Sequence, residues 1–233
     1  MAAPYFYEPL ITINHTSFEL SEESSKHAVQ VLRMEAGETI QLTNGQGGLF
    51  TATISLAHKK HCQVSIVSAT EILLPQKQHA IAVSPLKNNS RIEWFLEKAT
   101  ELGIHRIIPL ICQRTEKQVV KQERWQQILI AAMLQSQQVW LPILDAPTRF
   151  TDCIQQPYQG TKLIAHCLPN EKRSLTSFAT EHHCLICIGP EGDFTETEID
   201  TALAAGFQPV SLGDTRLRTE TAALTAAVVL QQF

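Results

Sequence analysis

The first third of the chain alternates apolar and polar residues with the two-residue period of β-strands. The alternation is clearest over residues 39–43, 49–57 and 62–69. Between the first two of these segments, the stretch Asn-Gly-Gln-Gly-Gly at 44–48 is typical of a hairpin turn. The pattern therefore predicts a small β domain.

One helix is predicted before these strands, over residues 22–32. Ser21 is expected to be its N-cap, and the two glutamates that follow suit the first turn of a helix. We expect one face of this helix to close one side of the β domain. The residues of that face are Ala28, Val29, Val31 and Leu32.

After residue 74 the rhythm changes to short apolar runs separated by stretches of helical periodicity. The runs expected to be strands are 79–83, 107–111, 162–165, 184–188 and 209–212, and the intervening helices include 92–102 and 125–138. This alternation is typical of a mostly parallel sheet covered on both faces, which binds ligands beyond the carboxyl ends of its strands. We expect two domains, 1–72 and 73–233, with the chemistry in loops of the second.

Composition narrows the class of protein. Of 233 residues 44% are hydrophobic and 18% charged, which excludes a disordered or collagen-like chain. No apolar run is long enough to cross a bilayer, and residues 1–8 lack the features of a secretory signal. The six cysteines are too sparse for a disulfide framework and are expected to be thiols. A cytoplasmic protein with no membrane partner is the expectation.

Charge is distributed unevenly, although the formal net charge is only −4. Residues 87–124 carry eight Lys or Arg against five Asp or Glu, whereas residues 1–72 carry four against seven. Any contact with a polyanion is expected to start in this basic segment, and the candidate phosphate-contacting residues are Arg114, Lys117, Lys121 and Arg124. The alternative is a solvated face of mixed charge.

Two loops that follow predicted strands carry the residues of greatest chemical interest. Gly189-Pro190-Glu191-Gly192 leaves the strand 184–188, and its glycines would allow the backbone to approach a ligand closely. A capping box at Thr195–Glu198 marks the start of the next helix. A tight turn without a ligand is the alternative, and neither a phosphate-binding loop nor a dinucleotide fingerprint is present.

The second loop, 213–221, lies between the strand 209–212 and an apolar helix over 222–231. A structural interpretation makes Thr219 the N-cap and Glu220 a partner of the helix dipole. It leaves Arg216 and Arg218 unexplained, because cations are disfavoured at the positive end of a helix.

The sequence gives little support for a metal site. Cys184 and Cys187 follow two histidines, but they would face opposite sides of one strand, and no second pair of this spacing exists. His166, at the end of the strand 162–165, lies at the ligand end of the sheet. It is therefore a candidate ligand-binding residue.

The segment Gly189–Gly192, followed by Leu212-Gly213 and by 217–223, resembles the carboxyl-terminal signature of the RsmE family. These are SPOUT-class methyltransferases that act on N3 of a uridine in 16S ribosomal RNA. The stretches 27–34, 98–103 and 125–136 are similar to other blocks of that family, so the resemblance covers almost the whole chain.

The resemblance implies an α/β protein with an amino-terminal PUA-like β-barrel and a SPOUT domain that contains a trefoil knot. It implies a homodimer, S-adenosylmethionine as cofactor, no metal, and an RNA partner that is 16S ribosomal RNA or the small ribosomal subunit. With His166 added from its place in the sheet, the expected cofactor-binding residues are His166, Gly189, Pro190, Glu191, Gly192, Leu212, Gly213, Leu217 and Arg218.

For catalysis, Arg218 is expected to stabilise negative charge on the uracil, and Glu220 or Glu191 to remove the N3 proton. Arg33, in the first-domain block, joins the expected RNA contacts. Two alternatives stay open: a non-catalytic RNA-binding module of the same fold, and a different α/β enzyme using a nucleotide cofactor.

The chain departs from the family pattern at three places. Asp193 stands where the family usually has a second glycine, and residues 134–138 and the start of the chain each lack a usual arginine. The helix 221–231 is apolar around nearly its whole circumference, which favours a dimer formed partly through it.

Overall fold

The computed structural model describes residues 3–169 and 171–232. Met1 and Ala2, which belong to the segment 1–8 in which no secretory signal is expected, lie outside the described residues. The chain divides into two compact units. The first contains Met1–Leu74 and Met133–Leu141, and the second contains Pro75–Ala132 and Pro142–Phe233. The segment 133–141 thus packs with the first unit, a long-range association that periodicity does not reveal.

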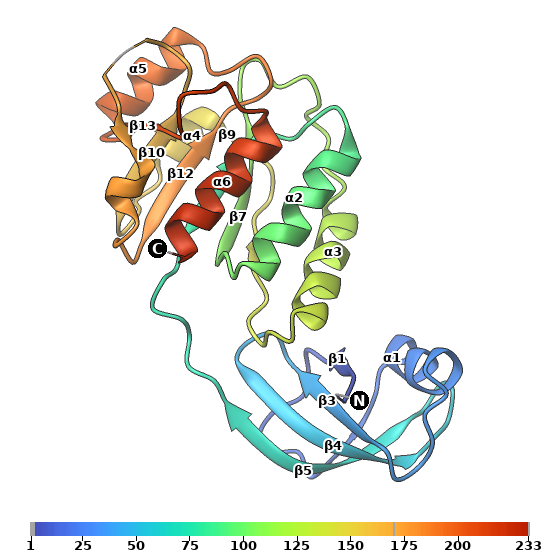
Figure 1. Cartoon of the computed structure of the whole chain (residues 1–233). Coiled ribbons are helices and arrows are strands. Elements are labelled where there is room, and N and C mark those ends of the chain that lie inside the picture. The colour runs from blue at the N-terminus through green and yellow to red at the C-terminus, as the bar shows by residue number, and fades with distance from the viewer. Residues whose placement is uncertain (1–2, 170, 233) are drawn as a thin grey trace. The chain divides into compact units, whose positions relative to one another are not determined.

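The first unit is built on a five-stranded sheet in the order β1-β3-β4-β5-β2 (Figure 1). Its strands are β1 (Tyr5–Tyr7), β2 (Ser17–Glu19), β3 (Thr39–Thr43), β4 (Gly48–Leu56) and β5 (Gln63–Glu71). The three predicted strands are confirmed as the antiparallel series β3-β4-β5. The three-residue strands β1 and β2 are too short to show a period and were not predicted.

The predicted helix is confirmed, and Ala28 and Val29 of its expected face pack on the core of the β domain, but Val31 and Leu32 do not. Ser21 caps α1 (Glu22–Lys26) by accepting a hydrogen bond from the Ser24 amide, and η1 (His27–Val31) then continues as a π-helix. The wider π turn rotates the following residues away from the expected face. Val31 and its neighbour Leu32 are therefore 65% and 42% exposed and do not close the β domain.

The segment 133–141 joins the first unit through Val139 and Trp140. The Val139 carbonyl accepts a hydrogen bond from the Gly47 amide at 2.9 Å, and the indole nitrogen of Trp140 donates to the Ile72 carbonyl at 3.2 Å. A Cβ on Gly47 would lie 2.5 Å from the Trp140 ring, so this position requires glycine. The predicted helix 125–138 ends early because Gln137 adopts a positive φ of 57°.

The second unit contains an all-parallel sheet in the order β11-β13-β10-β12-β6-β7-β8, with β9 paired to β7. The strands are β6 (Ala80–Val83), β7 (Arg106–Ile111), β8 (Ile143–Leu144), β9 (Thr148–Arg149), β10 (Thr161–Ala165), β11 (Arg173–Ser174), β12 (Cys184–Ile188) and β13 (Gln208–Ser211). Every predicted strand of this region is confirmed.

Helices cover both faces of this sheet, as predicted. The helical elements are α2 (Asn89–Glu101), α3 (Gln122–Gln135), α4 (Phe150–Gln155), η2 (Leu175–Phe178), α5 (Glu196–Ala204) and α6 (Thr219–Gln232). α6 packs on β6 and β12 with α2 beside it (Figure 1). On the other face, Phe150 and Cys153 of α4 and Ile199 of α5 belong to one apolar cluster with the sheet.

The strand order determines which loops meet. β12 lies between β6 and β10, and β13 lies on the far side of β10. Because the strands are parallel, their carboxyl ends share one edge of the sheet. The loops that follow β10, β12 and β13 therefore converge, although they are far apart in sequence.

Candidate active site

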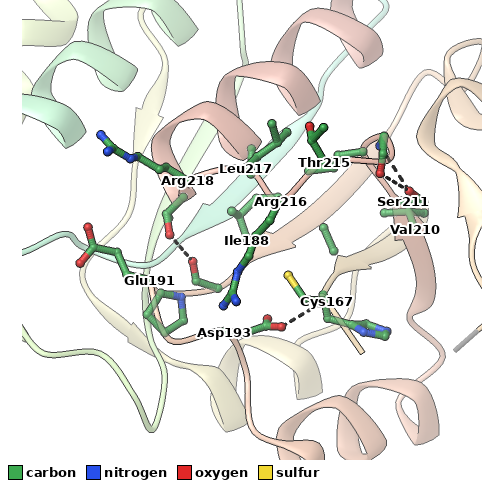
Figure 2. Close-up of a pocket in the computed structure, with 18 of the residues that line it drawn as sticks. Cys167, Ile188, Glu191, Asp193, Val210, Ser211, Thr215, Arg216, Leu217 and Arg218 are labelled. Carbon is green, nitrogen blue, oxygen red and sulfur yellow. Dashed lines mark hydrogen bonds between the residues drawn. The ribbon is translucent and has the colours of Figure 1, made fainter. Parts of the chain in front are cut away.

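The converging loops enclose a cavity of about 880 Å³ at the carboxyl ends of β10, β12 and β13. Figure 2 shows the side chains around it, with Glu191 and Arg218 at one end and Cys167 and Asp193 lower in the view. Of the nine expected cofactor-binding residues, those that line the cavity are His166, Gly189, Pro190, Glu191, Leu212, Gly213, Leu217 and Arg218.

Gly192 is the expected residue that does not line the cavity. It is exposed, and its carbonyl accepts a hydrogen bond from Arg114 Nη1 at 2.8 Å. A Cβ added there would lie 3.5 Å from the Arg114 side chain, an ordinary contact. Gly192 is therefore not part of the cavity wall, and its expected close approach to a ligand stays a prediction.

Gly189 is buried and closely surrounded. An added Cβ would lie 3.1 Å from the Phe194 ring, and the Gly189 carbonyl accepts a hydrogen bond from the Thr219 hydroxyl at 3.0 Å. Thr219 is thus the first residue of α6 and not its N-cap, because its hydroxyl donates to a neighbouring loop. Gly213 has a φ of 131°, a conformation that favours glycine.

His166 is the clearest sign that a ligand belongs in the cavity. Its side chain is buried, and neither ring nitrogen has a hydrogen-bond partner among the described residues. Burial, followed by the charge of Lys172, lowers the pKa of His166, so the neutral ring offers one donor and one acceptor. Buried polar atoms are nearly always hydrogen-bonded in proteins, so these nitrogens indicate a partner supplied by a ligand.

An arginine that sequence reasoning missed connects the two candidate bases. Arg91, in the first turn of α2, lines the cavity. Its Nη1 lies 3.3 Å from Glu191 Oε1, and its Nε lies 3.7 Å from Glu220 Oε1. The position of Arg91 after β6, which neighbours β12, is the signal that would have identified it, since the same sheet edge holds the other site residues.

The three predicted catalytic residues lie in different environments. Arg218 and Glu191 are exposed and line the cavity, whereas Glu220 is 7% exposed and is not part of its wall. One oxygen of Glu220, Oε2, has no hydrogen-bond partner among the described residues. Glu191 is thus accessible from the cavity, whereas Glu220 lies behind the wall and pairs with Arg91, which does line the cavity.

Most of the predicted RNA-contacting residues of the basic segment already have protein partners. Arg114 holds the loop after β12, Lys117 donates to Asn89 Oδ1, and Arg124 pairs with Glu93 at 3.2 Å. Lys121 is exposed. Part of this segment is therefore a surface of paired charges, as in the alternative interpretation of a solvated face of mixed charge.

The cysteines give no sign of a metal centre. All six are free thiols, and five are buried. Burial raises the pKa of Cys184 to about 12, which disfavours the thiolate that binds metals. Over the described ranges, no cluster of three or more His, Cys, Asp or Glu side chains is arranged to hold an ion. Over the same ranges, no helix is long and apolar enough to cross a membrane.

The fold and the site together define an RNA methyltransferase. The family profile described as an RNA methyltransferase domain matches residues 74–231, and one described as an RNA methyltransferase PUA domain matches residues 20–67. The second match identifies the first unit as a PUA domain. The expected enzyme class and the two kinds of domain are thereby confirmed, whereas the trefoil knot stays a prediction.

Named relatives narrow the class further. A ribosomal RNA small subunit methyltransferase E from Synechocystis is 34% identical over 84% of this chain and 67% of that protein. A solved protein of the same name from Neisseria gonorrhoeae, bound to S-adenosyl methionine, is 30% identical with a TM-score of 0.82, covering 99% of this chain and 98% of that one. The chain belongs to the ribosomal RNA small subunit methyltransferase E family.

A third comparison extends the likeness over the whole chain. A Legionella pneumophila protein solved with the bound cofactor SAM is 33% identical, with a TM-score of 0.90, and the match covers 100% of this chain and 98% of that one. The family resemblance seen in the sequence motifs is therefore confirmed at the level of the complete fold.

Proposed function

We propose that this chain transfers the methyl group of S-adenosylmethionine to N3 of a uridine in 16S ribosomal RNA. The observation that carries the proposal is the cavity at the carboxyl ends of β10, β12 and β13, lined by residues of two family motifs and by His166 with its unpartnered ring. S-adenosyl methionine is bound to the Neisseria relative, whose name also gives the RNA.

The residues present fit this cofactor. The cavity volume of about 880 Å³ is within the range of small-molecule sites. His166 offers a donor and an acceptor, and Gly213, at a positive φ that glycine adopts readily, leaves open space where a side chain would stand. When bound, S-adenosylmethionine supplies a methyl group activated by its sulfonium.

Arg218 and Glu191 are the residues that we assign to the chemistry on the uracil. The N3–H of uracil is poorly acidic at neutral pH, so a base must take the proton and a cation must stabilise the charge that remains. Glu191 is accessible from the cavity, which favours it over Glu220 as the base. Glu220 instead forms an ion pair with Arg91. Arg218 supplies the positive charge that stabilises the anionic uracil.

RNA contacts are proposed at the exposed basic residues. Lys121 in the second unit and Arg33 in the PUA domain are both exposed. Arg114, Lys117 and Arg124 can reach phosphates only by sharing or leaving their present partners. Acting as one set, they would make binding strongly dependent on salt concentration, because each phosphate contact releases counterions.

The remaining proposals concern topology, assembly and location. We propose a PUA-like barrel over 1–72, with which residues 133–141 pack, and a SPOUT domain over the rest of 73–233, with a trefoil knot in which α6 returns from β13 to pack on β12 and β6. Leu224, Val228 and Val229 of α6 are only half-buried in the single chain, which supports a homodimer through this helix. Because the proposed substrate is ribosomal RNA, we propose that the enzyme is cytoplasmic. Sedimentation at micromolar concentration should give twice the mass of the 26.0 kDa chain.

Calorimetry with S-adenosylmethionine, followed by methylation of isolated small subunits and of free RNA, tests the proposal. Binding and transfer to a uridine are expected, without any requirement for metal. A chain that binds RNA but not S-adenosylmethionine would be the non-catalytic module instead.

A further inference from the structure

The peptide group that joins His166 to Cys167 is held at both ends by charged side chains. The Cys167 amide donates a hydrogen bond to Asp193 Oδ2 at 2.8 Å, drawn as a dashed line in Figure 2. The His166 carbonyl accepts one from Lys172 Nζ at 2.8 Å. Hydrogen bonds with an ionised partner are about twice as strong as neutral ones. This peptide therefore cannot rotate without losing two strong contacts.

Asp193 reaches the peptide from a different loop, and its own backbone is unusual. Its φ is 63°, the left-handed region, and its second carboxylate oxygen accepts a hydrogen bond from the Phe194 amide at 2.8 Å. Glycine adopts this conformation without cost, whereas aspartate merely tolerates it. A turn alone would be better served by glycine, so the aspartate side chain adds something that the turn does not need.

What the carboxylate adds is a fixed orientation for His166. This residue lies on the clamped peptide and lines the cavity, and its two buried ring nitrogens have no partner in the part of the chain that the structure describes. The direction of a side chain follows from the backbone that carries it. Holding the peptide from both ends therefore limits where the ring nitrogens point before any ligand arrives, which lowers the ordering cost of binding.

Arg216 and Lys172 are the basic groups that also act on this part of the cavity. Figure 2 shows the Arg216 side chain pointing toward Asp193. Burial, followed by the charge of Asp193, raises the pKa of the Cys167 thiol, and Arg216 and Lys172 oppose that rise only in part. Cys167 is thus a neutral thiol, and its backbone amide is the group used here.

We propose that Asp193 is a positioning residue of the cofactor site: acting through the His166–Cys167 peptide, its carboxylate fixes the direction in which the His166 ring meets the polar groups of bound S-adenosylmethionine. This inference rests on the proposed function.

Two variants separate this role from that of a turn residue. Asp193→Gly removes both side-chain hydrogen bonds but suits the positive φ, and Asp193→Asn keeps the shape while offering a single acceptor oxygen. Asp200→Asn, on the exposed surface of α5, is the control for the loss of one charge. Calorimetry should show that the affinity for S-adenosylmethionine is about 10- to 100-fold lower in both Asp193 variants. The affinity of the control variant should equal that of the wild type.

A second readout needs no cofactor. Hydrogen exchange of the Cys167 amide should be faster in the free Asp193 variants than in the wild type. Lys172→Met should weaken cofactor binding in the same way, and combining it with Asp193→Gly should add little, because either change alone frees the same peptide.

Normal cofactor affinity in Asp193→Gly would overturn the inference and leave Asp193 as a turn residue. Fully additive effects in the double variant would also overturn it. Failure of the proposed function is distinguishable, because it would be seen as absence of binding in the wild-type protein.

Discussion

The hydroxyl of Thr219 donates a hydrogen bond to the carbonyl of Gly189 at 3.0 Å, joining the first turn of α6 to the loop that leaves β12. Thr219 is 5% exposed and Gly189 is buried, so water cannot replace this bond easily. The bond connects the two carboxyl-terminal motifs, which are separated by β13 and α5 in the chain. It therefore fixes one wall of the cavity against the other.

Thr219→Val should destabilise the protein by about 1–3 kcal/mol, because it leaves the buried Gly189 carbonyl without a donor. Thr219→Ser retains the hydroxyl and should lose less. Urea unfolding followed by circular dichroism would measure both changes. Equal stability of the valine variant and the wild type would mean that the bond contributes nothing to the fold.

Substitution by alanine should affect cofactor affinity differently at Gly192 and at Gly213. Gly192→Ala should leave S-adenosylmethionine affinity nearly unchanged, since this residue does not line the cavity and an added Cβ would make only an ordinary contact with Arg114. Gly213→Ala should weaken binding, because a φ of 131° is strained for any residue with a Cβ. Calorimetric titration of both variants checks the pair, and the reverse order of affinities would contradict the assigned cavity wall.

His79 should make stability depend on pH. It is fully buried at the opposite end of the sheet, and its Nδ1 accepts a hydrogen bond from the Cys184 amide. Burial, with a smaller effect of Lys77, lowers the pKa of His79 to about 4, whereas the unfolded value is about 6.5. Between these values the unfolded chain binds the extra proton, so the free energy of unfolding falls as pH falls from about 6.5 to about 4.

The loss from His79 should approach about 3 kcal/mol at the low end of this range. Urea unfolding at a series of pH values would measure it. In His79→Gln the steep part of the curve should flatten, because the titrating group is gone. A wild-type curve that stays level from pH 6.5 to 4 would contradict a neutral, buried His79.

The two carboxylates near Arg91 should differ in their contribution to catalysis. Glu191→Gln should lower the single-turnover rate by about 10²- to 10⁴-fold, the usual contribution of a general base. Glu220→Gln should lower it less, because Glu220 acts only by holding Arg91. If the Glu220 variant lost more activity than the Glu191 variant, the assignment of the base would have to be exchanged.

Local patterns in the sequence predicted the longer strands and helices, and long-range contacts explain part of what these patterns missed. The capping box at Thr195–Glu198 and the five strands of the second unit were readable because their signals lie within a few residues. Motif spacing likewise identified two of the three loops that enclose the cavity, those after β12 and β13. Arg91 was missed because it approaches from α2 only once β6 and β12 lie side by side.

Other misses have the same origin in three-dimensional context. The orientation of Gly192 depends on Arg114, which lies 78 residues earlier in the chain. The contact of Asp193 with Cys167 crosses 26 residues and two strands. The sequence shows that Asp193 stands where the family usually has glycine, but the hydrogen bond that its carboxylate accepts from the Cys167 amide is seen only in the folded structure.

If this protein methylates a uridine of 16S ribosomal RNA, Arg218 should stabilise the charge that develops on the base during transfer. The most direct test is single-turnover methylation of small-subunit RNA at saturating S-adenosylmethionine, with the product mapped to the nucleotide. The wild type should form N3-methyluridine at one site, and Arg218→Ala should do so about 10²- to 10³-fold more slowly with little change in RNA affinity. Arg218→Lys should recover part of the rate. Methylation at another atom, or an alanine variant with the wild-type rate and weakened RNA binding, would contradict the account.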